Sequence, residues 1–198
     1  MPTIVLKNNC QSTIKHYPPG DLAIWFFILA ELLVFGIFFA SYAFARMNNV
    51  ELFNELQNTL DREAALINTL ALITSSYFVV RAVTAIGENN SKLCFRWIVA
   101  AIGMGGMFLF VKSGEYAHHL SEGITLSSNT FYMFYLSLTF FHFMHVIMGM
   151  VILSAIAIKT RNGSYSANNC TGVHTGAAYW HMVDLVWLIL FPLVYIMR

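Results

Sequence analysis

A run of apolar residues from 22 to 45, interrupted by a single acidic side chain, constrains the fold of this chain more than any other feature. The run is longer than the roughly 20 residues that an α-helix needs to cross the hydrocarbon core of a membrane. At a rise of ~1.5 Å per residue, Glu31 lies about 13 Å along this helix from Leu22 and therefore near the middle of the membrane. An ionised carboxylate costs roughly 3 kcal/mol there. We therefore expect Glu31 to be protonated, paired or hydrated.

The composition of the whole chain agrees with a membrane protein. Of its 198 residues, 58% are hydrophobic and 11% are charged, whereas soluble domains carry about 25% charged residues. The formal net charge of +1 shows no basic surplus of the kind that binds nucleic-acid phosphates. We therefore exclude nucleic acid as a partner.

Five segments of the chain are apolar and long enough to span a membrane as helices. A transmembrane β-barrel would instead show segments of about ten residues with alternating polarity. The sequence therefore predicts an all-α integral membrane protein, a bundle of five transmembrane helices in a single membrane domain over residues 21–198. The expected spans cover residues 22–46, 66–86, 95–116, 131–158 and 177–197.

Two segments outside these spans carry predictions of their own. Residues 1–20 are polar and are expected to form a cytoplasmic tail. Residues 48–63 place Phe53, Leu56 and Leu60 at helical spacing. This pattern predicts a short amphipathic helix lying at the membrane interface.

The basic residues predict which way the bundle crosses the membrane, because cytoplasmic loops carry an excess of Lys and Arg. A cytoplasmic N-terminus places seven of them inside and four outside, so we expect the C-terminus on the outer side. All three cysteines would then face the reducing compartment and are expected to be unpaired. The inner basic residues are Lys7, Lys15, Arg81, Lys92, Arg96, Lys159 and Arg161, the outer ones Arg46, Arg62, Lys112 and Arg198, and the cysteines Cys10, Cys94 and Cys170.

Two pairs of ionisable side chains at helical spacing also lie inside the expected spans. His142 and His145 are three residues apart, which places them on one side of a helix, and His181 and Asp184 have the same spacing. Such groups need partners in a medium without water. We expect them to form, together with Glu31, a polar network that holds the helices together without a metal.

Two chemical alternatives compete with a structural network. Two membrane histidines can ligate a haem, so His142 or His145 together with His181 would suit a bis-His b-type cytochrome. Such a protein usually binds two haems, but the remaining pair, His118 and His119, is adjacent and lies at the end of a span. Metal catalysis by Glu and His is the second alternative, although the repeated Glu-x-x-His motif of ferritin-like proteins is absent.

The third expected span closes with several polar and aromatic residues. Tyr side chains are common anchors at the membrane interface, and solvated His residues need no special role. We therefore interpret Glu115, Tyr116, His118 and His119 as interfacial residues.

Two motifs resemble a known family. Residues 141–149 (FHFMHVIMG) and 179–187 (YWHMVDLVW, which includes Trp180 and Trp187) resemble the two signature helices of subunit III of haem-copper oxidases. Residues 25–39, with Glu31 at their centre, look like the family's helix that carries a buried, carbodiimide-reactive glutamate. The order and spacing of the motifs match over residues 21–197. Asn68-Thr69 resembles the opening of the next family helix, and Glu115-Tyr116 resembles the close of the one after it.

The chain lacks the two extra N-terminal helices of mitochondrial-type members. It is therefore similar to the short five-helix bacterial form, as found in quinol oxidases and in the subunit III-like protein associated with nitric oxide reductases. Residues 19–25 (PGDLAIW) look most like the nitric oxide reductase branch.

The resemblance implies a subunit without redox cofactors in a bacterial inner membrane. Such a subunit packs against a catalytic subunit, which carries the haem and metal, and it holds phospholipids in a cleft and supports proton uptake. Glu31 would face the partner or the lipid cleft, and His142, His145, His181 and Asp184 would support it. An independent proton-linked transporter that uses Glu31 is the remaining alternative.

Overall fold

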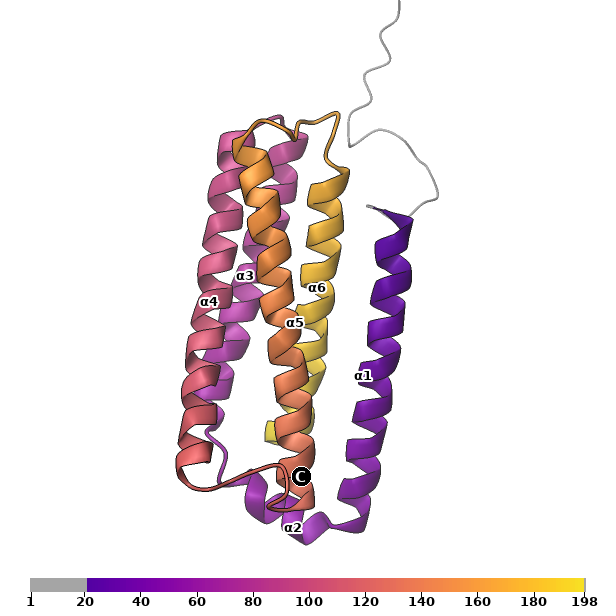
Figure 1. Ribbon diagram of the computed structural model, residues 1–198, viewed down its shortest axis with the longest axis vertical. Coiled ribbons are helices and arrows are strands. Elements are labelled where there is room, and N and C mark those ends of the chain that lie inside the picture. Colours follow the sequence, from indigo (N-terminus) through magenta and orange to yellow (C-terminus); the bar gives the residue numbers. More distant parts are fainter. Residues whose placement is uncertain (1–20, 198) are drawn as a thin grey trace, which may run out of the picture.

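The computed structural model describes residues 21–197, which fold into helices joined by short connections (Figure 1). Residues 1–20, expected to form a cytoplasmic tail, lie outside the described residues. The elements are α1 (Leu22–Asn48), α2 (Val50–Gln57), α3 (Arg62–Gly87), α4 (Ser91–Ser121), α5 (Thr130–Arg161) and α6 (Thr171–Phe191), followed by a π-helical turn, η1 (Pro192–Ile196).

Five of these helices are long and apolar enough to cross a membrane, which confirms the predicted all-α membrane fold. The helices extend past the apolar segments because polar side chains cap them. Asp61 accepts hydrogen bonds from the backbone N–H groups of residues 63 and 64 at the start of α3, and Asn90 and Asn129 cap α4 and α5 in the same way. The sixth helix begins at Thr171, six residues before the expected span.

The expected amphipathic helix is present but shorter than residues 48–63. It ends at Gln57, and residues 62 and 63 already belong to α3. Phe53 is completely buried and packs edge-on against Tyr42 and Phe131, with ring centroids 5.4 and 5.3 Å apart. The Gln57 side chain donates a hydrogen bond to the backbone carbonyl of Val194 at 2.7 Å. One side of α2 is thus packed against the end of the bundle.

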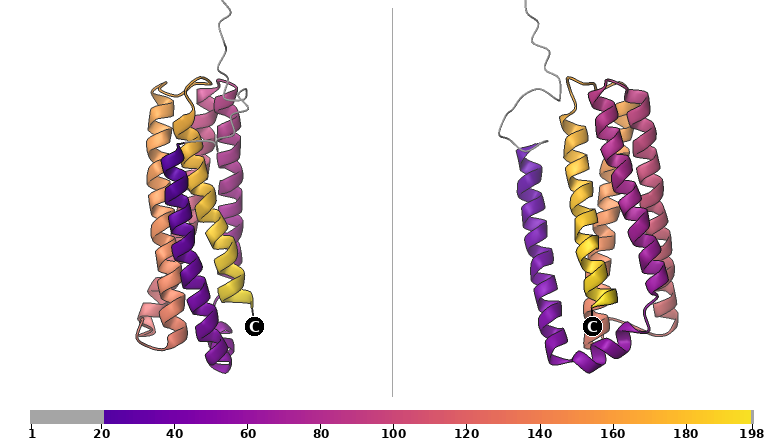
Figure 2. Two further views of the ribbon diagram at one scale, coloured as in Figure 1. Left: turned by 90° about the vertical axis from the view of Figure 1, so that its right-hand side faces the viewer. Right: turned by 180° about the vertical axis from the view of Figure 1, so that it is seen from behind.

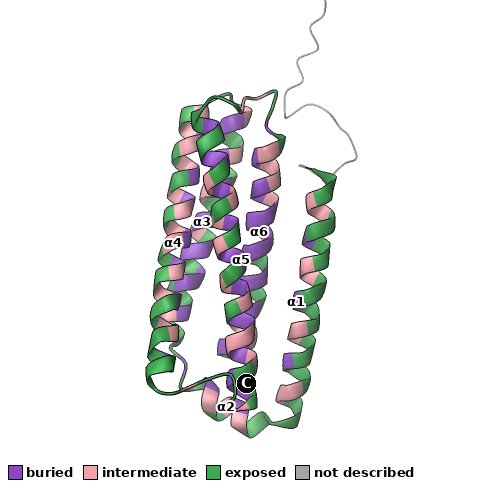
Figure 3. Cartoon of the chain, viewed as in Figure 1, coloured by how far each residue is buried: buried purple, intermediate pink, exposed green. Residues whose placement is uncertain are grey.

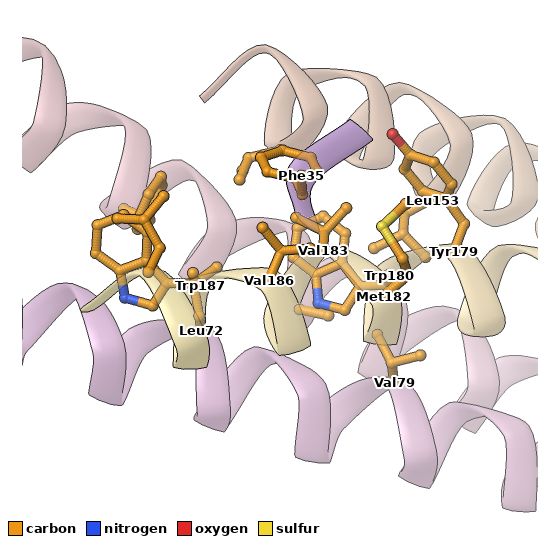
Figure 4. Close-up of a cluster of buried hydrophobic side chains, with 14 of the residues drawn as sticks. Phe35, Leu72, Val79, Leu153, Tyr179, Trp180, Met182, Val183, Val186 and Trp187 are labelled. Atoms are coloured by element: carbon orange, nitrogen blue, oxygen red, sulfur yellow. The ribbon is translucent and has the colours of Figure 1, made fainter. Parts of the chain in front are cut away.

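Helices α3, α4, α5 and α6 pack closely as an antiparallel group, and α1 lies beside α5 and α6 (Figures 1 and 2). Trp180 and Trp187 of α6 are completely buried in this group (Figure 4). Two glycines make room for Trp180, since a Cβ atom on Gly149 would lie 2.8 Å from its ring and one on Gly105 would lie 2.9 Å from it. Close helix contacts of this kind are typical of membrane bundles.

Helix α1 is the least covered of the five spans (Figure 3). Its buried residues are Ile28, Phe35 and Tyr42, which repeat every seven residues and form one narrow stripe. Large apolar side chains such as Phe26 and Leu33 remain exposed. Lipid or another protein must therefore cover most of α1.

The chain connections gather at two ends of the bundle. The Asp21 end holds the start of α1, the turn between α3 and α4, and the loop between α5 and α6. There the backbone N–H of Asp21 donates to the Thr175 hydroxyl at 3.2 Å, and the Asn89 side chain accepts from the N–H of Ala167 at 3.3 Å. The opposite end, named here after Gln57, holds α2, the loop between α4 and α5, and the C-terminal turn (Figure 1).

The cysteines depart in part from the expectation of unpaired thiols. Cys94 is a buried free thiol. Cys170 is disulfide-bonded, so the expectation is wrong for that residue. Cys10 lies outside the described residues.

Candidate functional site

Glu31 of α1 pairs with His145 of α5 at the edge of the bundle. The Nε2 atom of His145 lies 3.1 Å from a carboxyl oxygen of Glu31, and its Nδ1 lies 2.7 Å from the carbonyl oxygen of Phe141. Because a carbonyl only accepts, Nδ1 must carry a hydrogen. The hydrogen bond between Nε2 and Glu31 therefore needs one further proton, held either by the carboxyl group or by the ring.

This pair ties α1 to the rest of the bundle. The Glu31 side chain is 20% exposed and that of His145 is 9% exposed, so the pair sits at the edge of the bundle and not at its centre. Phe35 packs against the His145 ring at 5.3 Å and against Phe141 at 5.4 Å. The acidic residue of α1 thus has a polar partner, and the ring of that partner packs against aromatic side chains.

His181 and Asp184 lie on the side of α6 that faces α3. The Nδ1 atom of His181 is 2.7 Å from the hydroxyl oxygen of Ser76. Asp184 is 6% exposed, and neither of its carboxyl oxygens has a hydrogen-bond partner among the described residues. These two residues are therefore separate from the contact between Glu31 and His145.

His142 occupies a third environment. Its ring is completely buried between Phe108, at 5.6 Å, and Trp187, at 5.1 Å. Neither ring nitrogen has a hydrogen-bond partner in the part of the chain that the structure describes. The indole N–H of Trp187 donates instead to the Thr69 hydroxyl at 2.9 Å.

Of the five polar residues expected to form one network, the structure therefore joins only Glu31 and His145 directly. The others face different neighbours for two reasons. Residues three apart on an α-helix still differ in direction by about 60°, and the polar residues of α6 belong to another helix. His145 points at α1 while His142 points at α4, and the polar residues of α6 point at α3. Residue spacing along one helix does not show which neighbouring helix each side chain meets.

The polar group with the most complete set of partners was not expected from the sequence. Lys112 is completely buried, and its ammonium group lies 2.9 Å from a carboxyl oxygen of Glu115. It also donates to the hydroxyls of Tyr195 at 2.7 Å and Tyr135 at 3.3 Å. Both tyrosine hydroxyls donate in turn to the other oxygen of Glu115. We call these four residues the Lys112 cluster.

Two of the residues interpreted as interfacial, Glu115 and His119, are buried in the bundle and not solvated. Glu115 belongs to a buried ion pair, and His119 is buried against the rings of Tyr132 and Tyr135 at 5.9 and 5.7 Å. The His118 ring nitrogen lies 3.4 Å from Glu122, and the two side chains are 70% and 50% exposed. Lys and Glu three residues apart inside an apolar segment were a signal of pairing that the sequence did contain.

The remaining polar groups do not converge on a metal. No group of three or more His, Cys, Asp or Glu side chains among the described residues could hold a metal ion. Ring nitrogens of His145 and His181 are engaged with Glu31 and Ser76. The geometry therefore favours helix-to-helix contacts as the role of these groups.

Comparison with known proteins identifies relatives along nearly the whole chain. The family model described as cytochrome c oxidase subunit III matches residues 18–198. Cytochrome c oxidase subunit 3 of Thermostichus vulcanus is 32% identical over 177 residues, which cover 89% of this chain and 86% of the relative. A probable quinol oxidase subunit 3 of Staphylococcus saprophyticus is 26% identical, over 89% of this chain and 88% of the relative.

A third relative is a longer protein. The heme-copper oxidase subunit I+III of Aeropyrum pernix is 29% identical over 202 residues. The matched region covers 97% of this chain but 25% of that relative.

Proposed function

Because this chain belongs to the cytochrome c oxidase subunit III family, we propose that it is the non-catalytic subunit III of a bacterial haem-copper oxidase. The match over residues 18–198 is the observation that carries this proposal. In this role the chain stabilises the catalytic subunit, while electron transfer and oxygen chemistry take place at the haem and metal of that partner.

The contacts in the bundle support the role of a subunit that stabilises its partner. Two groups of polar side chains in the bundle bind one another across helices, the Lys112 cluster and the pair of Glu31 with His145. The apolar outer face of α1 needs a cover, which a partner helix or lipid would supply. The name of the Aeropyrum relative, subunit I+III, supports assembly with a subunit I.

Several finer roles belong to the same proposal. The subunit holds phospholipids between its helices and supports proton uptake by the complex. It lies in the bacterial inner membrane, with its N-terminus in the cytoplasm and its C-terminus in the periplasm. Cytochrome c or quinol is the electron donor of the complex, as the names of two relatives suggest. A nitric oxide reductase complex is the variant suggested by residues 19–25.

Co-purification tests the proposal. A tagged chain, extracted in mild detergent, should bring down a haem-containing catalytic subunit that mass spectrometry identifies. The chain expressed alone should show no Soret band. Stoichiometric haem on the isolated chain would contradict the proposal and favour the bis-His cytochrome.

The transporter alternative makes a different prediction. Proteoliposomes that hold this chain alone would then take up protons, and Glu31→Gln would abolish the uptake. We expect no uptake above empty vesicles, with or without the substitution. Uptake that depends on Glu31 would overturn the subunit assignment.

A further inference from the structure

The π-helical turn η1, at the Gln57 end of the bundle (Figure 1), is not a simple continuation of α6. Proline has no backbone N–H, so Pro192 cannot donate to Leu188 the hydrogen bond that would extend the α-helix. A wider bond closes the turn instead, from the N–H of Met197 to the carbonyl of Pro192 at 2.9 Å. Such π-helical turns are rare and are frequently found at functional sites. We call residues 192–197 the Tyr195 strap.

One hydrogen bond ties the strap to α2. The backbone carbonyls at the end of a helix lack partners within that helix. The Gln57 side chain supplies a donor to one of them, the carbonyl of Val194, at 2.7 Å. Gln57 is 1% exposed and Val194 is completely buried. Because Gln57 is the last residue of α2, this bond holds the end of α2 against the strap.

A second set of bonds ties the strap to the Lys112 cluster. The Tyr195 hydroxyl accepts from the ammonium group of Lys112 at 2.7 Å and donates to Glu115 at 3.0 Å. Four aromatic rings surround that ammonium group at 5.2 to 5.7 Å. Three of these rings belong to α4, α5 and α6, whereas the ring of Tyr195 belongs to the strap. The strap thus completes the enclosure of the buried charge.

The strap is attached at few points. In the part of the chain that the structure describes, it bonds to other elements through two neighbouring residues, Val194 and Tyr195. The side chains that follow, Ile196 and Met197, are about half exposed. Segments with few buried contacts open locally while the rest of a protein stays folded. Because Pro192 interrupts the hydrogen bonding of α6, the strap can move without unwinding that helix.

We propose that the Tyr195 strap is a lid over the Lys112 cluster, which opens locally and admits small solutes to the Lys112 ammonium group while the helices stay packed. Opening breaks the bonds of Tyr195 and leaves Lys112 with Glu115 on α4 and Tyr135 on α5. The ion pair therefore survives opening, and the lid can close again. This inference is independent of the proposed function.

In the alternative, the strap is a permanent part of the core, and Lys112 meets water only when the whole bundle unfolds. Both alternatives predict that Lys112 reacts slowly with reagents in the unsubstituted protein. They differ at the Asp21 end of the bundle, which lies opposite the strap. Local opening leaves the backbone amides there protected, whereas global unfolding exposes them together with Lys112.

The test follows acetylation of lysines by an N-hydroxysuccinimide ester, in the full-length chain purified with its partners. Mass spectrometry should show rapid reaction of the exposed Lys92 and Lys159 in every variant. Tyr195→Phe keeps the ring but removes the hydroxyl that Lys112 donates to, so acetylation of Lys112 should become about tenfold faster, the effect expected of one lost hydrogen bond to a charged group. Tyr77→Phe, at an exposed tyrosine of α3, is the matched control and should leave that rate unchanged.

A second variant tests the other attachment of the strap. Gln57→Leu removes the donor to Val194 and should also speed acetylation of Lys112. Hydrogen–deuterium exchange should become faster in α2 and stay unchanged in α3 and α4 at the Asp21 end.

Equal rates of Lys112 acetylation in the Tyr195→Phe and Tyr77→Phe proteins would overturn the proposal. Faster acetylation accompanied by faster deuterium exchange at the Asp21 end would overturn it as well, because the whole bundle would then be unfolding. Neither result touches the subunit assignment, which fails only if the unsubstituted chain does not co-purify with a catalytic subunit.

Discussion

Lys112 and Glu115 bring opposite charges into the bundle, where their side chains are 0% and 8% exposed. Removing one partner of a buried ion pair leaves an uncompensated charge and costs about 3–5 kcal/mol. Lys112→Met should therefore destabilise the protein strongly, seen as a lower midpoint of thermal unfolding in detergent. The double variant Lys112→Met/Glu115→Gln removes both charges and should recover most of the loss.

The matched control for this prediction is Lys159→Met. Lys159 is an exposed lysine near the end of α5, so its loss should leave the unfolding midpoint unchanged. A Lys112→Met protein as stable as this control would show that the ion pair contributes nothing to the fold.

Glu31 is a half-buried acid of α1 whose partner is His145. Glu31→Gln can still hydrogen-bond His145, so we expect its unfolding free energy to stay within about 1 kcal/mol of the unsubstituted protein. Glu31→Lys places an ammonium group beside His145 at a depth where a charge costs roughly 3 kcal/mol. It should lower the yield of assembled complex, measured by co-purification. Normal assembly of the Lys variant would mean that the site is hydrated.

At the level of helices, the close contact between α5 and α6 depends on a glycine, which has no side chain to separate them. A Cβ atom on Gly149 would lie 2.8 Å from the Trp180 ring, which is completely buried and cannot swing away. Gly149→Ala should therefore cost about 1–3 kcal/mol of unfolding free energy.

The matched control is Gly103, in the middle of α4, which has nothing within 4 Å of its Cβ position. Gly103→Ala should be neutral or stabilising, because Gly in a helix is less favourable than Ala by about 1 kcal/mol. Equal effects of the two substitutions, measured by the same unfolding assay, would contradict the packing argument.

The five spans could be predicted from the sequence because apolar length alone decides whether a helix can cross a membrane. Their ends could not, since hydropathy ignores the polar caps Asp61, Asn90 and Asn129. The need of Glu31 for a partner was also predictable from its depth. That the partner would be His145, while His142 faces Phe108, depends on how each helix is rotated in the bundle.

At the level of the whole molecule, the Lys112 cluster changes the charge count that sets the orientation. Lys112 is held in a buried ion pair and does not belong to a loop. Among the described residues, five basic side chains then lie toward the Asp21 end and two toward the Gln57 end. The first group is Arg81, Lys92, Arg96, Lys159 and Arg161, and the second is Arg46 and Arg62.

This asymmetry supports the proposed orientation, in which the Asp21 end faces the cytoplasm. The disulfide at Cys170 argues for the opposite orientation, because this residue lies at the Asp21 end and disulfides are rare in reducing compartments.

The accessibility of single introduced cysteines distinguishes the two orientations, in a chain whose own three cysteines are replaced by serine. Lys92 and Arg62 are exposed at opposite ends. A membrane-impermeant maleimide should label Arg62→Cys in intact cells whose outer membrane is permeable to it, and Lys92→Cys only after lysis. The reverse pattern would place the N-terminus of α1 on the periplasmic side and would identify the Cys170 disulfide as the better guide to orientation.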